Sequence, residues 1–337
     1  MRALLLITML AAPLLGQPRY VIEERGRFGY IDSSGAVVIA PEYPVRSNFS
    51  EGRAKQLRTR WLVDTETFFL APDGSRALDL HYNDAGMFSE GLARVLDVSW
   101  ALWRYWGYVD KSGNEVIAPQ FSDAGDFHGG RAWVSNRPIL FPGPDPYRYG
   151  FINTAGTLVV DYQYDVVTDF SDGRAAVTKF GKTGFIDTTG AEVIARQYDR
   201  ASGFSEGLAR VKQNGSWGYI DASGATLLPF SFDEARDFHE GLALVKKGTA
   251  WSVIDRTGSV VMAVNVPELQ YFSEGLAAFQ QDSKYGFMDR TGTVVIAPQF
   301  IRVQPFLNGR AEAETEKETG YIDRAGRFVW TRKLVRQ

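Results

Sequence analysis

The sequence predicts an all-β protein built as a tandem array of about nine short repeats. Three observations lead to this prediction: 34 glycines in 337 residues, an aromatic content of 13%, and two motifs that recur along almost the whole chain. Glycine-rich turns between short aromatic strands are typical of β-sheets. A motif with a fixed period of tens of residues indicates a repeat architecture. The array replaces the two domains that length alone would suggest.

The first motif occupies residues 218–224, with the sequence GYIDASG. Nine copies occur, of which those at 68–74 and 252–258 are degenerate. The position of its aspartate recurs at residues 32, 71, 110, 153, 187, 221, 255, 289 and 323. The spacings are 39, 39 and 43 residues, followed by 34 residues five times. Such regularity places the repeats from about residue 20 to residue 331.

A second motif, FSEGLA at residues 204–209, lies between copies of the first. It occurs eight times, beginning at Phe49, Phe88, Phe127, Phe170, Phe204, Phe238, Phe272 and Phe306. The segment that precedes it has no clear period. We expect this connector to return the chain so that its closing phenylalanine enters the core.

Each unit is predicted to be a three-stranded meander followed by this connector. Residues 208–212 alternate apolar and polar side chains, as a half-buried strand does. Asn214 and Gly215 suit a two-residue hairpin turn, and residues 217–220 form the second strand. Asp221 and the glycine that closes the motif suit a second turn. Short apolar runs such as 192–195 and 293–297 form the third strand.

These motifs resemble those of the WG repeat family, whose unit is labelled by a Trp-Gly dipeptide. The dipeptide stands at residues 106–107 and 217–218, and phenylalanine, tyrosine or threonine replaces the tryptophan in most other units. The resemblance covers nearly the whole chain after residue 20. It implies repeats of a kind found mainly in bacteria and often taken to mediate binding. It supplies no catalytic residue and no cofactor.

We expect the array to be an open solenoid or superhelix, with a closed β-propeller as the alternative. The segments near residues 20–24 and 328–331 align with the first and third strands of a unit, so the chain holds whole units in phase. A propeller usually has four to eight blades of four strands, which nine units of three strands fit poorly. Residues 332–337 form a short C-terminal tail.

Residues 1–16 are predicted to be a signal peptide. Arg2 precedes an uncharged apolar run over residues 3–16, which is too short to span a bilayer and contains Pro13. We therefore expect a secreted or periplasmic protein with no stable membrane insertion after the signal is removed. Its net charge of −3 also argues against nucleic acid as a partner.

No catalytic, cofactor or metal site is predicted. The chain has no cysteine and only three histidines, so thiolate chemistry is excluded and a zinc or Ser-His-Asp site is disfavoured. The repeated aspartates are explained by their turns, and the acidic position that follows Phe-Ser forms a second repeated row. We expect a non-catalytic scaffold for protein or ligand binding. The alternative is a carbohydrate-active enzyme or glycan-binding protein with a shallow site on the concave face.

Three adjacent units contain insertions at one equivalent place, the tip of the first hairpin. The distance from the second-motif phenylalanine to the aspartate position is 17 residues in regular units but 22, 22 and 26 in the second to fourth. Insertions on one edge of a repeat array often build its binding face. Tryptophan, tyrosine and arginine dominate binding hot spots. The predicted partner-binding residues are Trp61, Trp100, Trp103, Arg104, Tyr147 and Arg148; alternatively, the aromatic residues cap their own hairpins.

Overall fold

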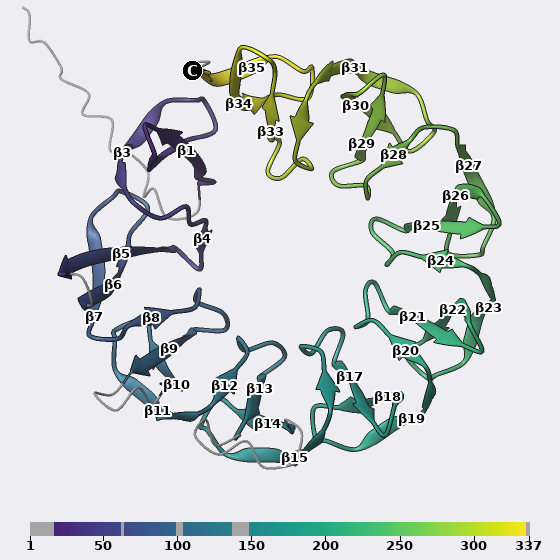
Figure 1. The fold of residues 1–337 in the computed structure, drawn as a ribbon, viewed down its shortest axis with the longest axis horizontal. Coiled ribbons are helices and arrows are strands. Elements are labelled where there is room, and N and C mark those ends of the chain that lie inside the picture. Colours follow the sequence, from purple (N-terminus) through teal and green to yellow (C-terminus); the bar gives the residue numbers. More distant parts are fainter. Residues whose placement is uncertain (1–16, 62–63, 99–103, 137–147, 335–337) are drawn as a thin grey trace, which may run out of the picture.

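The chain folds into nine small antiparallel sheets arranged as the blades of a closed ring, a nine-bladed β-propeller (Figure 1). This computed structural model describes residues 17–61, 64–98, 104–136 and 148–334, and side chains outside 59–65 within them. The repeats and the all-β class are confirmed. No helix occurs among the described residues, so none of them forms a helix long and apolar enough to cross a bilayer.

The first three blades contain β1 (Tyr20–Glu24), β2 (Arg27–Ile31), β3 (Val37–Tyr43), β4 (Phe49–Ser50), β5 (Arg53–Trp61), β6 (Asp64–Leu70), β7 (Arg76–Leu80), β8 (Asp84–Ala85), β9 (Leu92–Val98), β10 (Arg104–Asp110) and β11 (Glu115–Phe121). The next three contain β12 (Asp123–Ala124), β13 (Arg131–Ser135), β14 (Tyr149–Asn153), β15 (Leu158–Tyr164), β16 (Val166–Val167), β17 (Arg174–Lys179), β18 (Lys182–Asp187), β19 (Glu192–Tyr198), β20 (Arg200–Ala201), β21 (Leu208–Gln213), β22 (Ser216–Asp221) and β23 (Thr226–Phe232). The last three contain β24 (Glu234–Ala235), β25 (Leu242–Lys247), β26 (Ala250–Asp255), β27 (Val260–Val264), β28 (Glu268–Leu269), β29 (Leu276–Gln281), β30 (Lys284–Asp289), β31 (Val294–Phe300), β32 (Arg302–Val303), β33 (Ala311–Glu314), β34 (Glu318–Ile322) and β35 (Phe328–Lys333).

Eight of the nine blades have four strands, one more than the sequence predicted. The additional strand is two residues long and pairs with the first strand of the meander. In seven blades it lies within the connector, whereas in the second blade it is β4, which begins at the second-motif Phe49. A two-residue strand produces no periodicity, which is why the pattern did not reveal it. The predicted alternation is confirmed in β21, where Ala209 and Val211 are buried and Arg210 and Lys212 are partly exposed.

The glycine of the Trp-Gly dipeptide allows the next strand to bulge over it. In the third blade the pairing of β10 with β11 shifts register on both sides of Tyr108. A Cβ atom on Gly107 would lie 2.4 Å from the Ile117 carbonyl oxygen and 2.6 Å from the Pro119 nitrogen. The absence of a side chain therefore permits this close backbone contact.

The hydrophobic core lies between neighbouring blades. The cluster around Tyr219 and Leu228 of the sixth blade continues into Phe238 and Ile254 of the seventh. The connector phenylalanine packs on the aromatic ring of the preceding blade, as Phe238 does on Tyr219 with centroids 4.9 Å apart. Stability is therefore a sum of contacts between neighbours, as in other repeat proteins.

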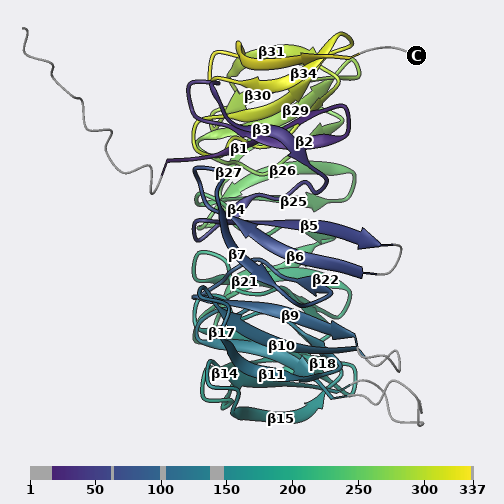
Figure 2. The same cartoon turned by 90° about the vertical axis from the view of Figure 1, so that its left-hand side faces the viewer.

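The expected open array is wrong, because the ninth blade packs against the first (Figures 1 and 2). No strand is exchanged: the first blade is built from β1 to β3 and the ninth from β32 to β35. At each junction the turn glycine packs on the outer strand of the preceding blade, as Gly224 does on Ile194. Gly35 meets Val329 in the same way. Closure depends on the rotation between blades, which the repeat pattern does not specify.

Two tyrosines complete the junction between the ninth and first blades. The rings of Tyr20 and Tyr321 lie 5.4 Å apart. The Tyr321 hydroxyl donates to the Val21 carbonyl at 2.8 Å, and the Tyr20 hydroxyl donates to the Asn308 carbonyl at 2.6 Å. In addition, the Arg310 guanidinium donates to the Ser33 carbonyl across the same junction.

We expect Gly107→Ala to lower the free energy of unfolding by about 1–3 kcal/mol, because the bulged strand must move away from the new methyl group. Gly203→Ala is the matched control, since the nearest atom to its added Cβ would be Thr168 Oγ1 at 3.9 Å. Urea unfolding of both variants measures the effect. Equal midpoints for the two variants would contradict this role of the glycine.

Candidate functional site

The repeated aspartates are occupied in their turns. The Asp221 carboxylate accepts hydrogen bonds from the Ser223 amide at 2.8 Å, the Ser223 hydroxyl at 2.6 Å and the Ala225 amide at 3.1 Å. These bonds, led by that of the Ser223 hydroxyl, hold the pKa of Asp221 below its ordinary value. Gly224 closes the turn with a φ of 86°. The turn role predicted for these aspartates is confirmed.

The second acidic row links six of the blades to the blade that follows. The Asp172 carboxylate accepts the Gly207 amide at 2.7 Å, and the Glu240 carboxylate accepts the Gly275 amide at 2.8 Å. The same link recurs from Glu51 to Gly91, from Glu90 to Gly129 and Gly130, from Glu206 to Gly241, and from Glu274 to Gly309. The loops that carry this row point toward the centre of the ring (Figure 1). We call these residues the acidic row.

Basic side chains support the acidic row from the following blade. Lys111 pairs with Glu51 at 2.9 Å, and Arg290 pairs with Glu240 at 2.8 Å. Partial burial alone would raise the pKa of Glu240, but hydrogen bonds from Arg290 and from the Gly275 amide outweigh it and hold that pKa below its ordinary value. The acidic row is therefore structural, and its carboxylates are occupied.

The first hairpins of the second to fifth blades end on one side of the ring, at the right in Figure 2, which we call the hairpin face. β5 has nine residues and β6 seven, whereas the regular hairpin β21–β22 has six in each strand. Figure 2 shows β5 and β6 extending beyond their neighbours. The insertions of the third and fourth blades, at residues 99–103 and 137–147, lie outside the described residues.

Most of the predicted partner-binding residues lie outside the described part of the chain. Trp100, Trp103 and Tyr147 fall there. Trp61 ends β5, but its side chain is likewise outside that part.

The two predicted arginines are described. Arg104 begins β10 and is exposed. Arg148 precedes β14 and donates to the Asp165 carboxylate at 2.6 Å and to the Gln163 carbonyl at 3.2 Å. Arg148 is therefore held by its own blade and the following connector.

The same Asp165 carboxylate holds an exposed aromatic residue that sequence reasoning missed. Asp165 accepts the Phe180 amide at 2.9 Å. Phe180 lies at the tip of β17–β18, is 82% exposed, and has a φ of 53°. A bulky residue at positive φ is a genuine outlier. The available signal was a Phe-Gly pair at the turn where the sixth blade has Asn214-Gly215.

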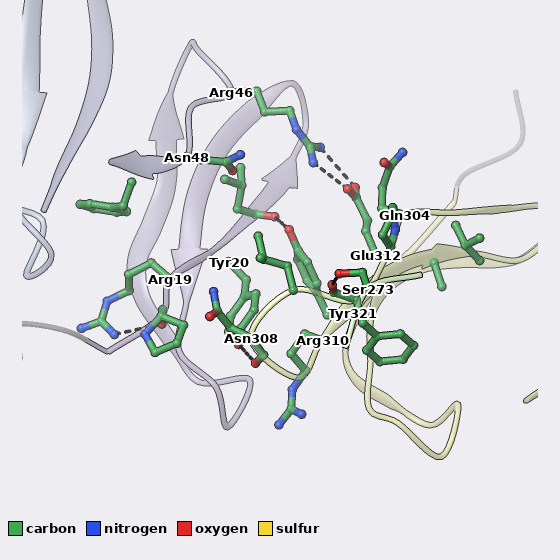
Figure 3. Close-up of a pocket in the computed structure, with 18 of the residues that line it drawn as sticks. Arg19, Tyr20, Arg46, Asn48, Ser273, Gln304, Asn308, Arg310, Glu312 and Tyr321 are labelled. Carbon is green, nitrogen blue, oxygen red and sulfur yellow. Dashed lines mark hydrogen bonds and ion pairs between the residues drawn. The ribbon is translucent and has the colours of Figure 1, made fainter. Parts of the chain in front are cut away.

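A cavity of about 1000 Å³ lies at the junction of the ninth and first blades (Figure 3). β1 lines it, together with the connector segments that precede β33 and β5. Arg46 of the second blade reaches Glu312 of the ninth, with a 2.6 Å ion pair between Nη2 and Oε2. A smaller cavity of about 200 Å³ continues along β1 and shares Val21, Arg46 and Glu312 with the larger one.

Among the described residues no three or more histidine, aspartate or glutamate side chains gather as a metal site would require. His128 lies near Asp169, with His128 Nε2 4.0 Å from a carboxylate oxygen. The His239 ring packs on that of Tyr271 at 4.7 Å.

A family model described as "WG containing repeat" matches residues 28–55, 77–96, 106–137, 149–182, 184–217, 217–248, 251–285 and 285–317. No curated protein matches the chain.

Several solved structures are similar to this one at low identity. Apo AztD from Citrobacter koseri is 12% identical, with a TM-score of 0.45, over 82% of this chain and 93% of that one. The uncharacterized protein lmo1340 from Listeria monocytogenes is 12% identical, with a TM-score of 0.40, over 84% and 91%. Kluyveromyces lactis Hsv2 is 10% identical, with a TM-score of 0.36, over 72% of each chain. These likenesses carry no argument about function.

We expect acid to weaken the links of the acidic row. The pKa of Glu240 is lower in the folded chain than its value of about 4.3 in the unfolded chain. Its contribution to stability is therefore complete above about pH 4.3 and is lost as the pH falls through the pKa of the folded chain. Melting temperatures measured between pH 7 and pH 3 should decrease once the pH is below about 4. Glu240→Gln should flatten that fall, whereas Glu24→Gln, at an exposed position of β1, should not. Parallel curves for wild type and Glu240→Gln would refute this role.

Proposed function

Because the chain belongs to the WG repeat family, we propose that it is an exported, non-catalytic scaffold that binds a protein partner through its hairpin face. The observation that carries the proposal is Phe180, an 82% exposed aromatic residue beside three consecutive lengthened hairpins. Large aromatic and arginine side chains act as anchors at protein interfaces. Phe180, Arg104 and Arg148 offer both chemistries on neighbouring blades.

The conformation of Phe180 supports a role in binding rather than in folding. A residue other than glycine in the left-handed region costs about 1–2 kcal/mol, and asparagine is better tolerated there. The exposed ring recovers little of this cost through burial. The Lys179 ammonium lies 5.5 Å from the ring centroid, and such exposed contacts contribute only about 0.5–1 kcal/mol. A contact with a partner would bury the ring and explain its presence.

Export is proposed from the apolar run over residues 3–16 that follows Arg2. Mass spectrometry of the protein made in its own cells should show an N-terminus between residues 16 and 20. A cytosolic chain that retains Arg2 would contradict the proposal.

The non-catalytic assignment rests on the carboxylates. The turn aspartates and the acidic row accept hydrogen bonds within the fold, as Asp221 and Glu240 do.

Phe180→Asn tests the binding role, because it gives the fifth blade the same Asn-Gly hairpin turn that the sixth blade has. We expect the free energy of unfolding to rise by about 1 kcal/mol, since asparagine tolerates positive φ. We also expect partner binding to weaken by more than about 1 kcal/mol. Asp282→Asn at the equivalent tip of β29–β30 is the control, and it should leave binding unchanged.

The measurement is quantitative capture from secreted or periplasmic extract with wild type and both variants as bait. A partner captured by wild type and by Asp282→Asn, but lost with Phe180→Asn, supports the proposal. The proposal would be overturned if two baits each captured the partner as fully as wild type does: Phe180→Asn, and a chain whose three long tips are shortened to Asn-Gly.

A further inference from the structure

β1 lacks the inner strand that pairs with the first meander strand in the other eight blades. On this unpaired edge the Val21 carbonyl accepts the Tyr321 hydroxyl at 2.8 Å. In the sixth blade β20 pairs with β21, and the Asp199 amide donates to the Lys212 carbonyl at 2.8 Å. Glu23 holds the position of Lys212, since Tyr20 pairs with Ile31 as Ala209 pairs with Ile220. Within the described residues no strand pairs with this edge of β1. Unpaired strand edges are templates for a further strand.

The cavity at the junction lies where that inner strand would run. Its walls include β32 of the ninth blade on one side and the segment from Arg46 to Phe49 of the second blade on the other. These are the inner connectors of the two blades that flank the first. The smaller cavity extends the space along β1 to Glu23. We call the combined space the β1 groove (Figure 3).

Tyr20 already supplies the aromatic contact that a connector would bring. Its position is alanine in every other blade, namely at Ala54, Ala93, Ala132, Ala175, Ala209, Ala243, Ala277 and Ala311. In seven junctions the connector phenylalanine lies 4.8–5.1 Å from the ring of the preceding blade. Tyr20 makes this contact with Tyr321 instead. A strand entering the groove therefore needs a small residue where connectors have phenylalanine.

The charge of the groove favours an acidic occupant. Four arginines and two glutamates line the larger cavity: Arg19, Arg46, Arg302, Arg310, Glu312 and Glu314. Gly52 also lines it. In the acidic row the equivalent glycine amides donate to a carboxylate of the preceding blade, but among the described residues no acidic-row motif stands before β1. A carboxylate of the incoming segment can replace Glu312 as the ion-pair partner of Arg46 at little cost in free energy, because ion pairs between partly exposed groups are weak.

We propose that the β1 groove binds an extended acidic segment of another polypeptide, which adds to β1 as the inner strand of the first blade. Backbone hydrogen bonds to the free edge provide affinity, and arginines with the Gly52 amide select carboxylates. The groove involves the ninth, first and second blades. It is therefore separate from Phe180, and failure at either site leaves the other untouched.

The absence of cysteine permits a trapping experiment on the full chain. The probe is a peptide with the sequence of residues 198–207, carrying Arg200→Cys as a thiopyridine disulfide and Phe204→Ala. In the sixth blade Arg200 lies opposite Lys212, so a bound peptide places its cysteine opposite residue 23. Glu23→Cys attacks this disulfide and releases pyridinethione, whose absorbance gives the rate. Lys212→Cys, whose strand edge is covered by β20, is the matched control.

We expect the peptide to react with Glu23→Cys at least about ten-fold faster than with Lys212→Cys, after correction for the rate of each thiol with dithiodipyridine. N-methylation of the peptide at Asp199 removes the donor to the Glu23 carbonyl and should abolish the difference. Neutral replacements, Asp199→Asn and Glu206→Gln, should slow trapping at residue 23 by about five-fold or more, and added salt should do the same.

Tyr20→Ala gives a second, independent readout. Wild-type β1 should prefer the peptide with Phe204→Ala, whereas Tyr20→Ala should prefer the peptide that keeps Phe204, because the aromatic place is then open. Equal trapping rates at residues 23 and 212 would overturn the proposal. It would also be overturned if the N-methylated peptide were trapped as fast as the unmodified one, because that result indicates anion binding only. Absence of trapping, expected if residues 1–16 of the chain itself fill the groove, would also overturn it.

Discussion

The edge-to-face contact between a connector phenylalanine and the ring of the preceding blade is the interaction on which the whole ring depends. A single blade of three or four short strands cannot bury its aromatic face alone, so each blade is completed by its neighbour. The same edge-to-face geometry occurs at distant junctions, for example between Phe238 and Tyr219 and between Phe306 and Phe287. The carboxylate links of the acidic row and the turn glycines on outer strands reinforce the same junction. In the closed ring seven junctions have this ring contact, and Tyr20 supplies it on Tyr321 at the junction of the ninth and first blades.

This constraint explains why the first blade departs from the repeat. No connector precedes β1 within the described residues, so the contact on Tyr321 must come from elsewhere, and Tyr20 supplies it from a position that is otherwise alanine. Asn308 takes the place of an acidic residue, and its carbonyl accepts the Tyr20 hydroxyl. Arg46 replaces a small apolar residue and reaches the ninth blade. Three departures from the consensus thus meet at one junction.

Local features of the fold could be predicted from the sequence, and long-range ones could not. The alternation at Ala209 and Val211 and the turn at Asp221 depend on neighbouring residues, and both are confirmed. The inner strands were missed because two residues have no period. Closure was predicted wrongly because the rotation between blades arises from packing across each interface. The partners of the acidic row are about 35 residues distant, so only the structure shows why that position is acidic.

The candidate site, like the fold, could be predicted from the sequence only in part. Insertions at equivalent tips could be counted, and the predicted roles of Trp61, Trp100, Trp103 and Tyr147 stay predictions. Phe180 could have been found, because a phenylalanine before glycine in a hairpin turn opposes the usual turn chemistry. The β1 groove could not, since it arises from segments more than 250 residues apart, as the pairing of Arg46 with Glu312 shows.

The replacement of alanine by Tyr20 also bears on where a ring of this kind can be opened. Since the nine junctions are built alike, packing alone does not dictate which of them carries the chain ends. One aromatic substitution in the first strand suffices to cover the ring that a lost connector would leave bare. A circular permutant of this ring would therefore need one such aromatic residue in the first strand at its new opening.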